Sequence, residues 1–522
     1  MRFCYRLAVL ILLAAFVVRG ERWIESNSQT FDEANHIASG LSYLRTGDFR
    51  LNIEDPPLWK LVWALPLWRR DDVPFSPDAE AWARGDAWTI GNDFLYDSPL
   101  PSMEILGMCR RMNLFVGFVL IVCLNRVAHR LAGRMAALAA TAFACLDPVL
   151  LSLASILSTD LGLSLTTFLT FAAIREYLDR PTRGGVLRVG VCLGLCLASK
   201  FSSVFVLSTI LVLLIARRMR GGWVGLPGSA GSSKDSLAAA MRIGLIALLT
   251  LSLCYFGWRL PDWGAGLKQQ LVRNTFDPPS FYLFGEISSV GWWWYFPVCL
   301  AIKIPLPILL LAPLGIVRTI RRRRAGEIEY ALAAPLLFLS AMVACRVNLG
   351  VRVVLPVVVF MYLWAGIGIA SLPRRWSVAV LSIAVVWMGT SAIRNSRAEL
   401  SWVNETVGSE RAIEVLGDSN LDWGQDLIAL REWMERNEVR TVALSYAGTA
   451  PPEAYGIRYR SLPGWGGLRP PMAEPDEEPK YLAVSVSNLQ GIYLADSTLY
   501  RYRMEEPPIS TLRGGIRIYR LP

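Results

Sequence analysis

Long apolar runs separated by short arginine clusters fill most of the chain. Several runs approach the ~20 residues that a helix needs to cross a bilayer. Placing the arginine clusters on the cytoplasmic side predicts about 11 membrane segments, with the N-terminus inside and the C-terminus outside. The first run, residues 7–18, leads into Arg19-Gly20 and not into a small-residue cleavage site. This favours an uncleaved first transmembrane helix over a signal peptide.

Two stretches of this pattern each predict a pair of segments. A helix over about 109–125 ends at Arg126, and a further segment over about 135–146 reaches Asp147. The run 189–216 is long for one span and carries Lys200 near its middle. Two short segments that meet at Lys200 keep the following arginines on the cytoplasmic side.

The C-terminal tail has a different character. It has no long apolar run, and short β-like stretches occur at 441–444, 481–484 and 517–519, with a helical pattern over 425–436. We therefore divide the chain into a transmembrane domain, 1–394, with a first outer loop at 20–105, and a soluble extracytoplasmic α/β domain, 395–522. The predicted class is an α-helical polytopic membrane protein with a small outer α/β domain.

The first outer loop carries two acidic pairs beside the membrane. It reads FDEANHIASGLSYLRTGDFRLNIEDPPLWK over residues 31–60. Apolar residues recur at helical spacing after Thr30, a candidate N-cap, and predict an interfacial helix with Asp32 and Glu33 in its first turn. Pro56-Pro57 would start a second such helix.

Composition excludes several kinds of protein. Hydrophobic residues make up 53% of the chain and charged residues 18%, with a net charge of +10. The basic residues lie between apolar runs, which argues for membrane topology and against nucleic-acid binding. The nine cysteines lack metal or disulfide spacing, and two histidines leave little basis for a histidine metal site or a serine triad.

Five cations break the topology rule because they lie at or near the outer boundary: Lys60, Lys200, Lys303, Arg346 and Arg352. Snorkelling to headgroups explains a single lysine. Five on one face, beside Asp55 and Asp160, favour an anion-binding cavity that opens outward.

Such a cavity suits transfer of a sugar from a polyprenyl phosphate. The cations would stabilise the charge that the phosphate gains on leaving, and a carboxylate would take the proton of the acceptor. A transporter or lipid flippase is the alternative, although no internal repeat is visible and the polar cluster lies at one face. A non-catalytic membrane scaffold that presents the tail is a third reading.

The chain resembles the GT-C glycosyltransferases of the protein O-mannosyltransferase and aminoarabinose transferase group (family 39-like). The resemblance rests on these stretches: FDEANHIASGLSYLRTGDF with EDPPLWK, ASKFSS, GWWWYFPVCLAIKIPLP, NLGVRVVLP and GDSNLDWGQDL. It implies that Asp32 is the catalytic base, with Glu33 beside it, and that Lys60 follows the family's Pro-Pro-Leu segment. Asp55 departs from the pattern, because many members carry His or Lys there.

These observations predict an inverting glycosyltransferase at the extracytoplasmic face of the inner membrane, with a protein, glycan or lipid acceptor. The predicted catalytic residues are Asp32 and Glu33, and the predicted substrate-binding residues are Lys303, Arg352, Lys200, Arg346, Lys60, Asp160 and Asp55. No cofactor is assigned, although Asp32 and Asp160 could ligate a hard divalent cation.

The tail motif DSNLDWGQD, residues 418–426, leaves two readings open. Its glycine and distal glutamate are misplaced for an EF-hand. A turn followed by a helix with Asp422 at its N-cap explains the motif, and contact with sugar or acceptor is the alternative.

Overall fold

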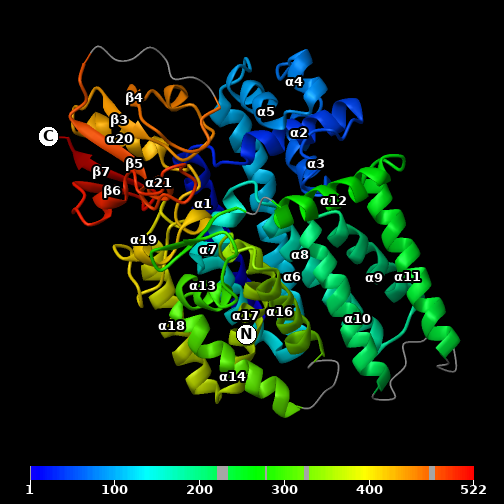
Figure 1. Cartoon of the computed structure of the whole chain (residues 1–522). Helices are drawn as coiled ribbons and strands as arrows, with labels where there is room; N and C mark the ends of the chain where they lie inside the picture. The colour runs from blue at the N-terminus through cyan, green and yellow to red at the C-terminus, as the bar shows by residue number, and fades with distance from the viewer. Residues whose placement is uncertain (1, 220–232, 277–278, 323–328, 469–476, 522) are drawn as a thin grey trace.

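The structure, a computed structural model, describes residues 2–219, 233–276, 279–322, 329–468 and 477–521 (Figure 1). Long helices fill the lower part of the view in Figure 1. A sheet lies above them on one side and a group of short helices on the other.

Within the described residues, five helices are long and apolar enough to cross a membrane, or up to seven spans if each of two bent helix pairs is one span. The five are α1 Arg2–Ser26, α6 Ser102–Leu146, α11 Ser233–Cys254, α17 Leu355–Ser371 and α18 Arg374–Arg394. The bent pairs are α7 Pro148–Ser155 with α8 Thr159–Asp179, and α13 Tyr295–Lys303 with α14 Leu306–Arg322. Shorter apolar helices are α9 Arg183–Leu197, α10 Val204–Met219 and α16 Ala334–Cys345.

The polytopic helical class is confirmed, but the expected 11 spans are not all continuous helices. Two expected segments join in α6, which is kinked at Gly133, where φ is 85°. The bent pairs turn by 113° and 115°. The predicted break at Lys200 is confirmed, because α9 ends just before it and α10 follows after a short 3-10 turn, Phe201–Ser203.

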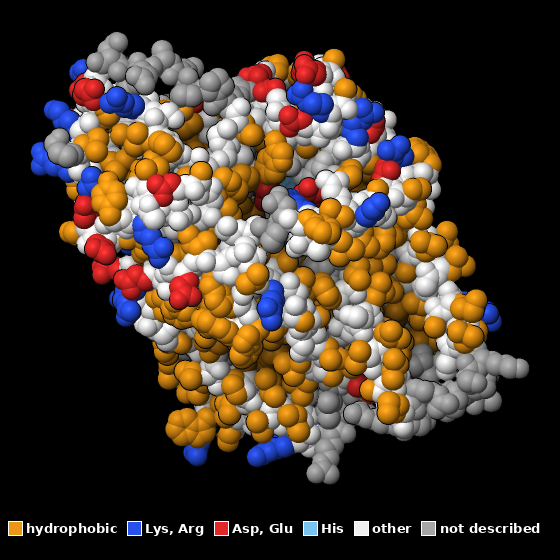
Figure 2. Space-filling model, in the orientation of Figure 1, with side chains coloured by type: hydrophobic (Ala, Val, Ile, Leu, Met, Phe, Trp, Pro, Cys, Tyr) orange, Lys and Arg blue, Asp and Glu red, His pale blue; other side chains and the backbone are white. Residues whose placement is uncertain are grey.

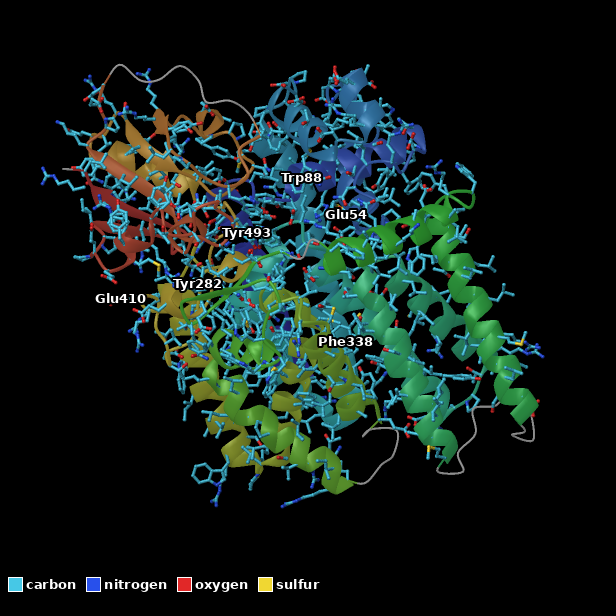
Figure 3. All side chains as sticks on the ribbon, viewed as in Figure 1. Glu54, Trp88, Tyr282, Phe338, Glu410 and Tyr493 are labelled. Carbon is cyan, nitrogen blue, oxygen red and sulfur yellow. The ribbon has the colours of Figure 1, made fainter. Side chains whose placement is uncertain are left out.

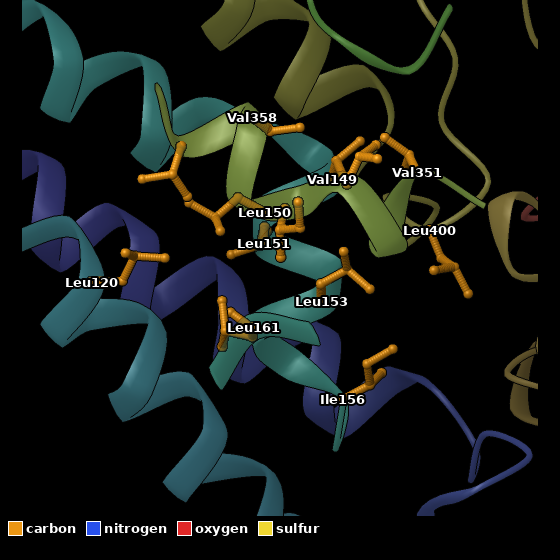
Figure 4. Close-up of a cluster of buried hydrophobic side chains, with 14 of the residues drawn as sticks. Leu120, Val149, Leu150, Leu151, Leu153, Ile156, Leu161, Val351, Val358 and Leu400 are labelled. Carbon is orange, nitrogen blue, oxygen red and sulfur yellow. The ribbon is translucent and has the colours of Figure 1, made fainter. Parts of the chain in front are cut away.

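The membrane part is built around a short buried helix. All eight residues of α7 are buried, and α7 packs on α1, α6 and α8. Figure 4 shows its leucines among side chains from neighbouring elements, including Leu120, Leu161 and Val358. Helix α17 packs beside α6, α8 and α14. This apolar centre fixes the outer ends of these helices, where the polar residues lie.

The surface agrees with a membrane setting. In Figure 2, hydrophobic side chains cover the lower helical part, basic side chains lie at its lower edge, and acidic and basic side chains gather above. Such a belt between polar edges is typical of a membrane protein.

Helices are present at both positions where interfacial helices were predicted. Helix α2 spans Glu33–Thr46 and α3 spans Leu58–Ala64. The N-cap of α2 is Asp32 and not Thr30, and the Asp32 side chain makes no cap hydrogen bond. The remaining outer elements are α4 Ala79–Arg84, α5 Ala87–Tyr96, α12 Leu260–Phe276 and a hairpin of β1 Phe281–Leu283 and β2 Glu286–Ser288.

The C-terminal segment contains a five-stranded sheet of order β4-β3-β5-β7-β6. The strands are β3 Val442–Ser445, β4 Tyr459–Ser461, β5 Tyr481–Ser485, β6 Ser510–Leu512 and β7 Ile516–Arg520. Strand β3 pairs in parallel with β4 and β5, and β7 pairs antiparallel with β5 and β6. The three predicted strands are therefore confirmed. Short helices α19 Ala412–Val415 and α21 Val486–Leu489 accompany the sheet.

The predicted tail helix begins later than expected. Helix α20 spans Leu427–Arg436 with Asp426 at its N-cap, so the expectation of Asp422 as N-cap was wrong. The Asp422 carboxylate instead accepts hydrogen bonds from the backbone N–H groups of Gly424 and Ser487. It therefore joins the loop that carries the tail motif to the start of α21.

Candidate active site

A hollow with acidic and basic side chains lies between the sheet and the group of short helices beside it (Figure 2). Trp88, Glu54 and Tyr493 are labelled around this region in Figure 3, and they come from α5, the loop before α3 and the C-terminal segment. Three parts of the chain that are distant in sequence therefore meet at the hollow.

Asp32 is half-buried at the N-cap of α2. The charges that act on it belong to Arg352, Asp55, Asp418 and Lys200. Burial raises the pKa of Asp32 to about 6, against the lowering effect of Arg352. A carboxylate with such a pKa is ionised at neutral pH and is still basic enough to accept a proton.

Asp160 holds two of the predicted cations together. Its Oδ1 lies 2.6 Å from Lys200 Nζ and its Oδ2 lies 3.6 Å from a terminal guanidinium nitrogen of Arg352. Asp160 is buried at the start of α8, while Lys200 and Arg352 are partly exposed. The break at Lys200 and the bend before α8 thus bring two positive charges to the hollow.

Arg352 is fixed on several sides. Its Nε donates to Leu349 O at 3.1 Å and to Ser419 Oγ at 3.0 Å, and its guanidinium lies 4.3 Å from the centroid of the Trp423 ring. Both Ser419 and Trp423 belong to the tail motif GDSNLDWGQDL. The C-terminal segment therefore orients a cation of the membrane part.

Glu33 is placed differently from Asp32. It is fully buried, and Arg110 contacts its two oxygens at 2.9 and 2.6 Å. The backbone N–H groups of Thr30 and Leu157 also donate to it. Arg110 in turn donates to the carbonyl oxygens of residues 24, 27 and 28. This network anchors the start of α2.

Lys60 and Asp55 lie at the edge of the site. Lys60 Nζ donates to Asn52 O at 2.6 Å, Asp55 O at 2.7 Å and Tyr43 Oη at 2.9 Å. Burial alone would raise the pKa of Asp55, but neighbouring His36, Lys200 and Lys60 hold it below its usual range. Lys60 thus supports the loop that carries Asp55.

The structure does not bring every predicted residue to the hollow. Lys303 is buried, and its Nζ donates to Leu400 O at 2.8 Å and Asn420 O at 2.7 Å. Arg346 is exposed just after α16, in a left-handed backbone conformation with φ of 56°. The predicted residues that do meet are Asp32, Asp55, Asp160, Lys200 and Arg352.

Sequence reasoning missed the backbone pairing that positions Asp32. Ser28 N–H donates to Gln425 O at 2.9 Å and Phe31 N–H donates to Trp423 O at 3.0 Å. Ser28 Oγ also donates to Gly424 O and accepts from Leu427 N–H. Residues 28–31 therefore lie along the tail motif, and Asp32 follows directly.

Arg110 was also missed, although a signal existed. It is an arginine within the apolar run that begins at Cys109. A charge at such a depth requires a partner. No group of three or more potential metal-ligating side chains was found in the described parts of the chain.

The comparisons with known proteins agree with this geometry. The family model described as dolichyl-phosphate-mannose-protein mannosyltransferase matches residues 109–229. The structure of ArnT from Cupriavidus metallidurans bound to undecaprenyl phosphate is similar at 10% identity and a TM-score of 0.52, over 98% of this chain and 97% of that chain. The apo structure of the same protein is similar at 13% identity and a TM-score of 0.50, over 83% of this chain and 72% of that chain. No curated protein sequence matches.

These findings confirm the resemblance stated from the sequence: the chain has the GT-C fold. The family match over residues 109–229 and the fold both agree with the expected similarity to the protein mannosyltransferase and ArnT group. They give no support to the transporter alternative.

Proposed function

We propose that the chain transfers a sugar from a polyprenyl-phosphate donor to an acceptor at the extracytoplasmic face, with inversion at the anomeric carbon. The observation that carries the proposal is the placement of half-buried Asp32 under the influence of Arg352 and Lys200. The similar ArnT structure contains undecaprenyl phosphate, which agrees with a lipid phosphate as donor.

In the proposed reaction an acceptor hydroxyl attacks the anomeric carbon. Asp32 takes the hydroxyl proton while the bond between that carbon and the phosphate oxygen breaks. The lipid phosphate leaves with one more negative charge than it had in the donor. Lys200 and Arg352 stabilise that charge. Glu33, as the partner of Arg110, positions Asp32 and does not itself take part in proton transfer.

The direct test is an assay with purified protein in lipid nanodiscs and a panel of radiolabelled polyprenyl-phosphate sugars. The panel is supplied with a membrane extract as the source of acceptor. Release of free polyprenyl phosphate together with a labelled acceptor supports the transferase. Movement of the donor across a vesicle membrane with its sugar bond intact supports a flippase instead.

Loss of Arg352 should weaken binding of the polyprenyl-phosphate sugar. Arg352→Ala removes a positively charged hydrogen-bonding group from the phosphate site. We therefore expect the KM for the polyprenyl-phosphate sugar to rise about tenfold to a hundredfold. Arg411→Ala is a matched control, because Arg411 is exposed in the tail and pairs with Glu414. An unchanged donor KM in the Arg352 variant would remove this residue from the phosphate site.

The pH profile should follow the ionisation of Asp32. Its pKa is raised to about 6 by burial, and only the deprotonated form can act as base. We therefore expect kcat/KM to be level above about pH 7 and to fall about tenfold per unit below pH 6. Rates measured from about pH 4.5 to about 8 check this. A profile that stays level down to pH 4.5 would exclude Asp32 as the base.

A further inference from the structure

Asp418 is a partly exposed carboxylate of the tail, next to Ser419, whose hydroxyl accepts from Arg352. The charges of Asp418 and Arg352 act on each other, and Asp418 also acts on Asp32. Tyr493 lies beside Asp418, and the phenol and the carboxylate act on each other. In a bound donor, Arg352 would hold the phosphate and the anomeric carbon would face Asp32. The sugar would then lie beside both residues, close to Asp418.

Two features of Asp418 have no structural explanation in the fold. Its backbone is left-handed, with φ of 54°, a conformation that costs energy for a residue with a side chain. Its Oδ2 is buried without a hydrogen-bond partner. A buried acceptor without a donor is unfavourable, and such groups are accounted for by a missing partner such as a ligand.

Aromatic rings from the tail and from the first outer loop pack together beside Asp418. Trp465 stacks on Phe31, at 4.1 Å between centroids, and on Tyr493, at 4.0 Å. Trp88 meets Phe31 edge-on at 5.3 Å. The rings therefore run from Phe31, which precedes Asp32, to Tyr493, which lies beside Asp418. A wall of rings beside a carboxylate offers apolar contact and hydrogen-bond acceptors together, which suits a sugar ring.

The charges around the hollow restrict the kind of sugar. Four carboxylates, Asp32, Asp55, Asp160 and Asp418, face three cations. Lys200 and Arg352 would hold the lipid phosphate, and Lys60 is already bound to carbonyl oxygens of the loop that carries Asp55. A carboxylated sugar would bring a further negative charge beside Asp32 and Asp418. A neutral sugar or an amino sugar avoids this repulsion.

We infer that Asp418 and Tyr493 form the sugar-recognition subsite for the donor, which accepts neutral or amino sugars and rejects uronic acids. The inference rests on the proposed function. In this subsite Asp418 Oδ2 accepts a hydrogen bond from a sugar hydroxyl or amine. The Tyr493 hydroxyl holds the carboxylate in place, and the aromatic wall covers the ring.

The test is displacement of radiolabelled undecaprenyl phosphate from the full chain in nanodiscs. The competitors are undecaprenyl-phosphate glucose, mannose, 4-amino-4-deoxyarabinose and glucuronic acid. The selectivity ratio is the half-displacing concentration of the glucuronic acid donor divided by that of the best neutral or amino-sugar donor. For the wild type we expect this ratio to be about tenfold or more. Asp418→Asn should reduce this ratio about tenfold, while undecaprenyl phosphate itself still binds.

Tyr493→Phe provides a second variant in case Asp418→Asn does not fold, and it should reduce the ratio in the same direction. Asp496→Asn is the matched control, because Asp496 is exposed in the same segment. If the wild type transfers sugar but both the Asp418 and Tyr493 variants keep the wild-type selectivity ratio, the inference is overturned and the proposed function stands. If the wild type turns over no donor of the panel, the proposed function itself fails.

Discussion

Asp32→Asn should lower sugar transfer about 10²–10⁴-fold, the range that a positioned general base contributes. The amide has the shape of the carboxylate but cannot take the proton of the acceptor. Because the Asp32 side chain makes no cap hydrogen bond to α2, its replacement should leave the fold intact. The measurement is kcat/KM for release of polyprenyl phosphate, alongside the unfolding temperature of the purified protein.

Asp71→Asn is the control for this variant, because Asp71 is exposed on the same outer side. It should transfer sugar at the wild-type rate. Full activity of Asp32→Asn, with normal folding, would move the base to another carboxylate of the hollow. Asp418 would then be the first residue to examine, since its charge acts on the same place.

Glu33→Gln should destabilise the protein by about 3–5 kcal/mol, because it leaves the charge of Arg110 buried without its partner. Both side chains are fully buried, and the shortest contact between them is 2.6 Å. We expect a lower yield of folded protein and a clearly lower unfolding temperature. Glu414→Gln breaks an exposed pair with Arg411 and should change stability little.

This prediction separates two roles for Glu33. A structural role predicts that the folded fraction of Glu33→Gln retains a normal pH profile. A direct catalytic role predicts a protein of normal stability that has lost transfer, and that result would contradict the anchoring role inferred here from Arg110.

The sequence indicated how deep each charged residue lies in the membrane, but not which way its side chain points. Charge and hydropathy placed Asp32, Lys200 and Arg352 at the outer boundary, and the broken helices then bring them together. Lys303 lies at a similar boundary, yet its ammonium contacts carbonyl oxygens of Leu400 and Asn420, about 100 residues away. Hydropathy cannot reveal which of several partners a buried lysine reaches.

The pair Asp32-Glu33 shows the same limit on a smaller scale. Adjacent residues at the start of a helix point in different directions. One carboxylate reaches the hollow and the other reaches Arg110, and nothing in the local pattern distinguishes them. The strands of the tail were easier to predict, since their β-branched and aromatic runs carry a local signal.

The hydrogen bonds between Ser28 and the tail join residues 396 and 399 positions apart. A ribosome must therefore synthesise every span before the segment that supports Asp32 is made. Until then Asp32 lacks this support, and Arg352 lacks its contact with Trp423. The protein consequently becomes competent for transfer only as its last quarter is completed, so a chain truncated after the final span would be inserted but inactive.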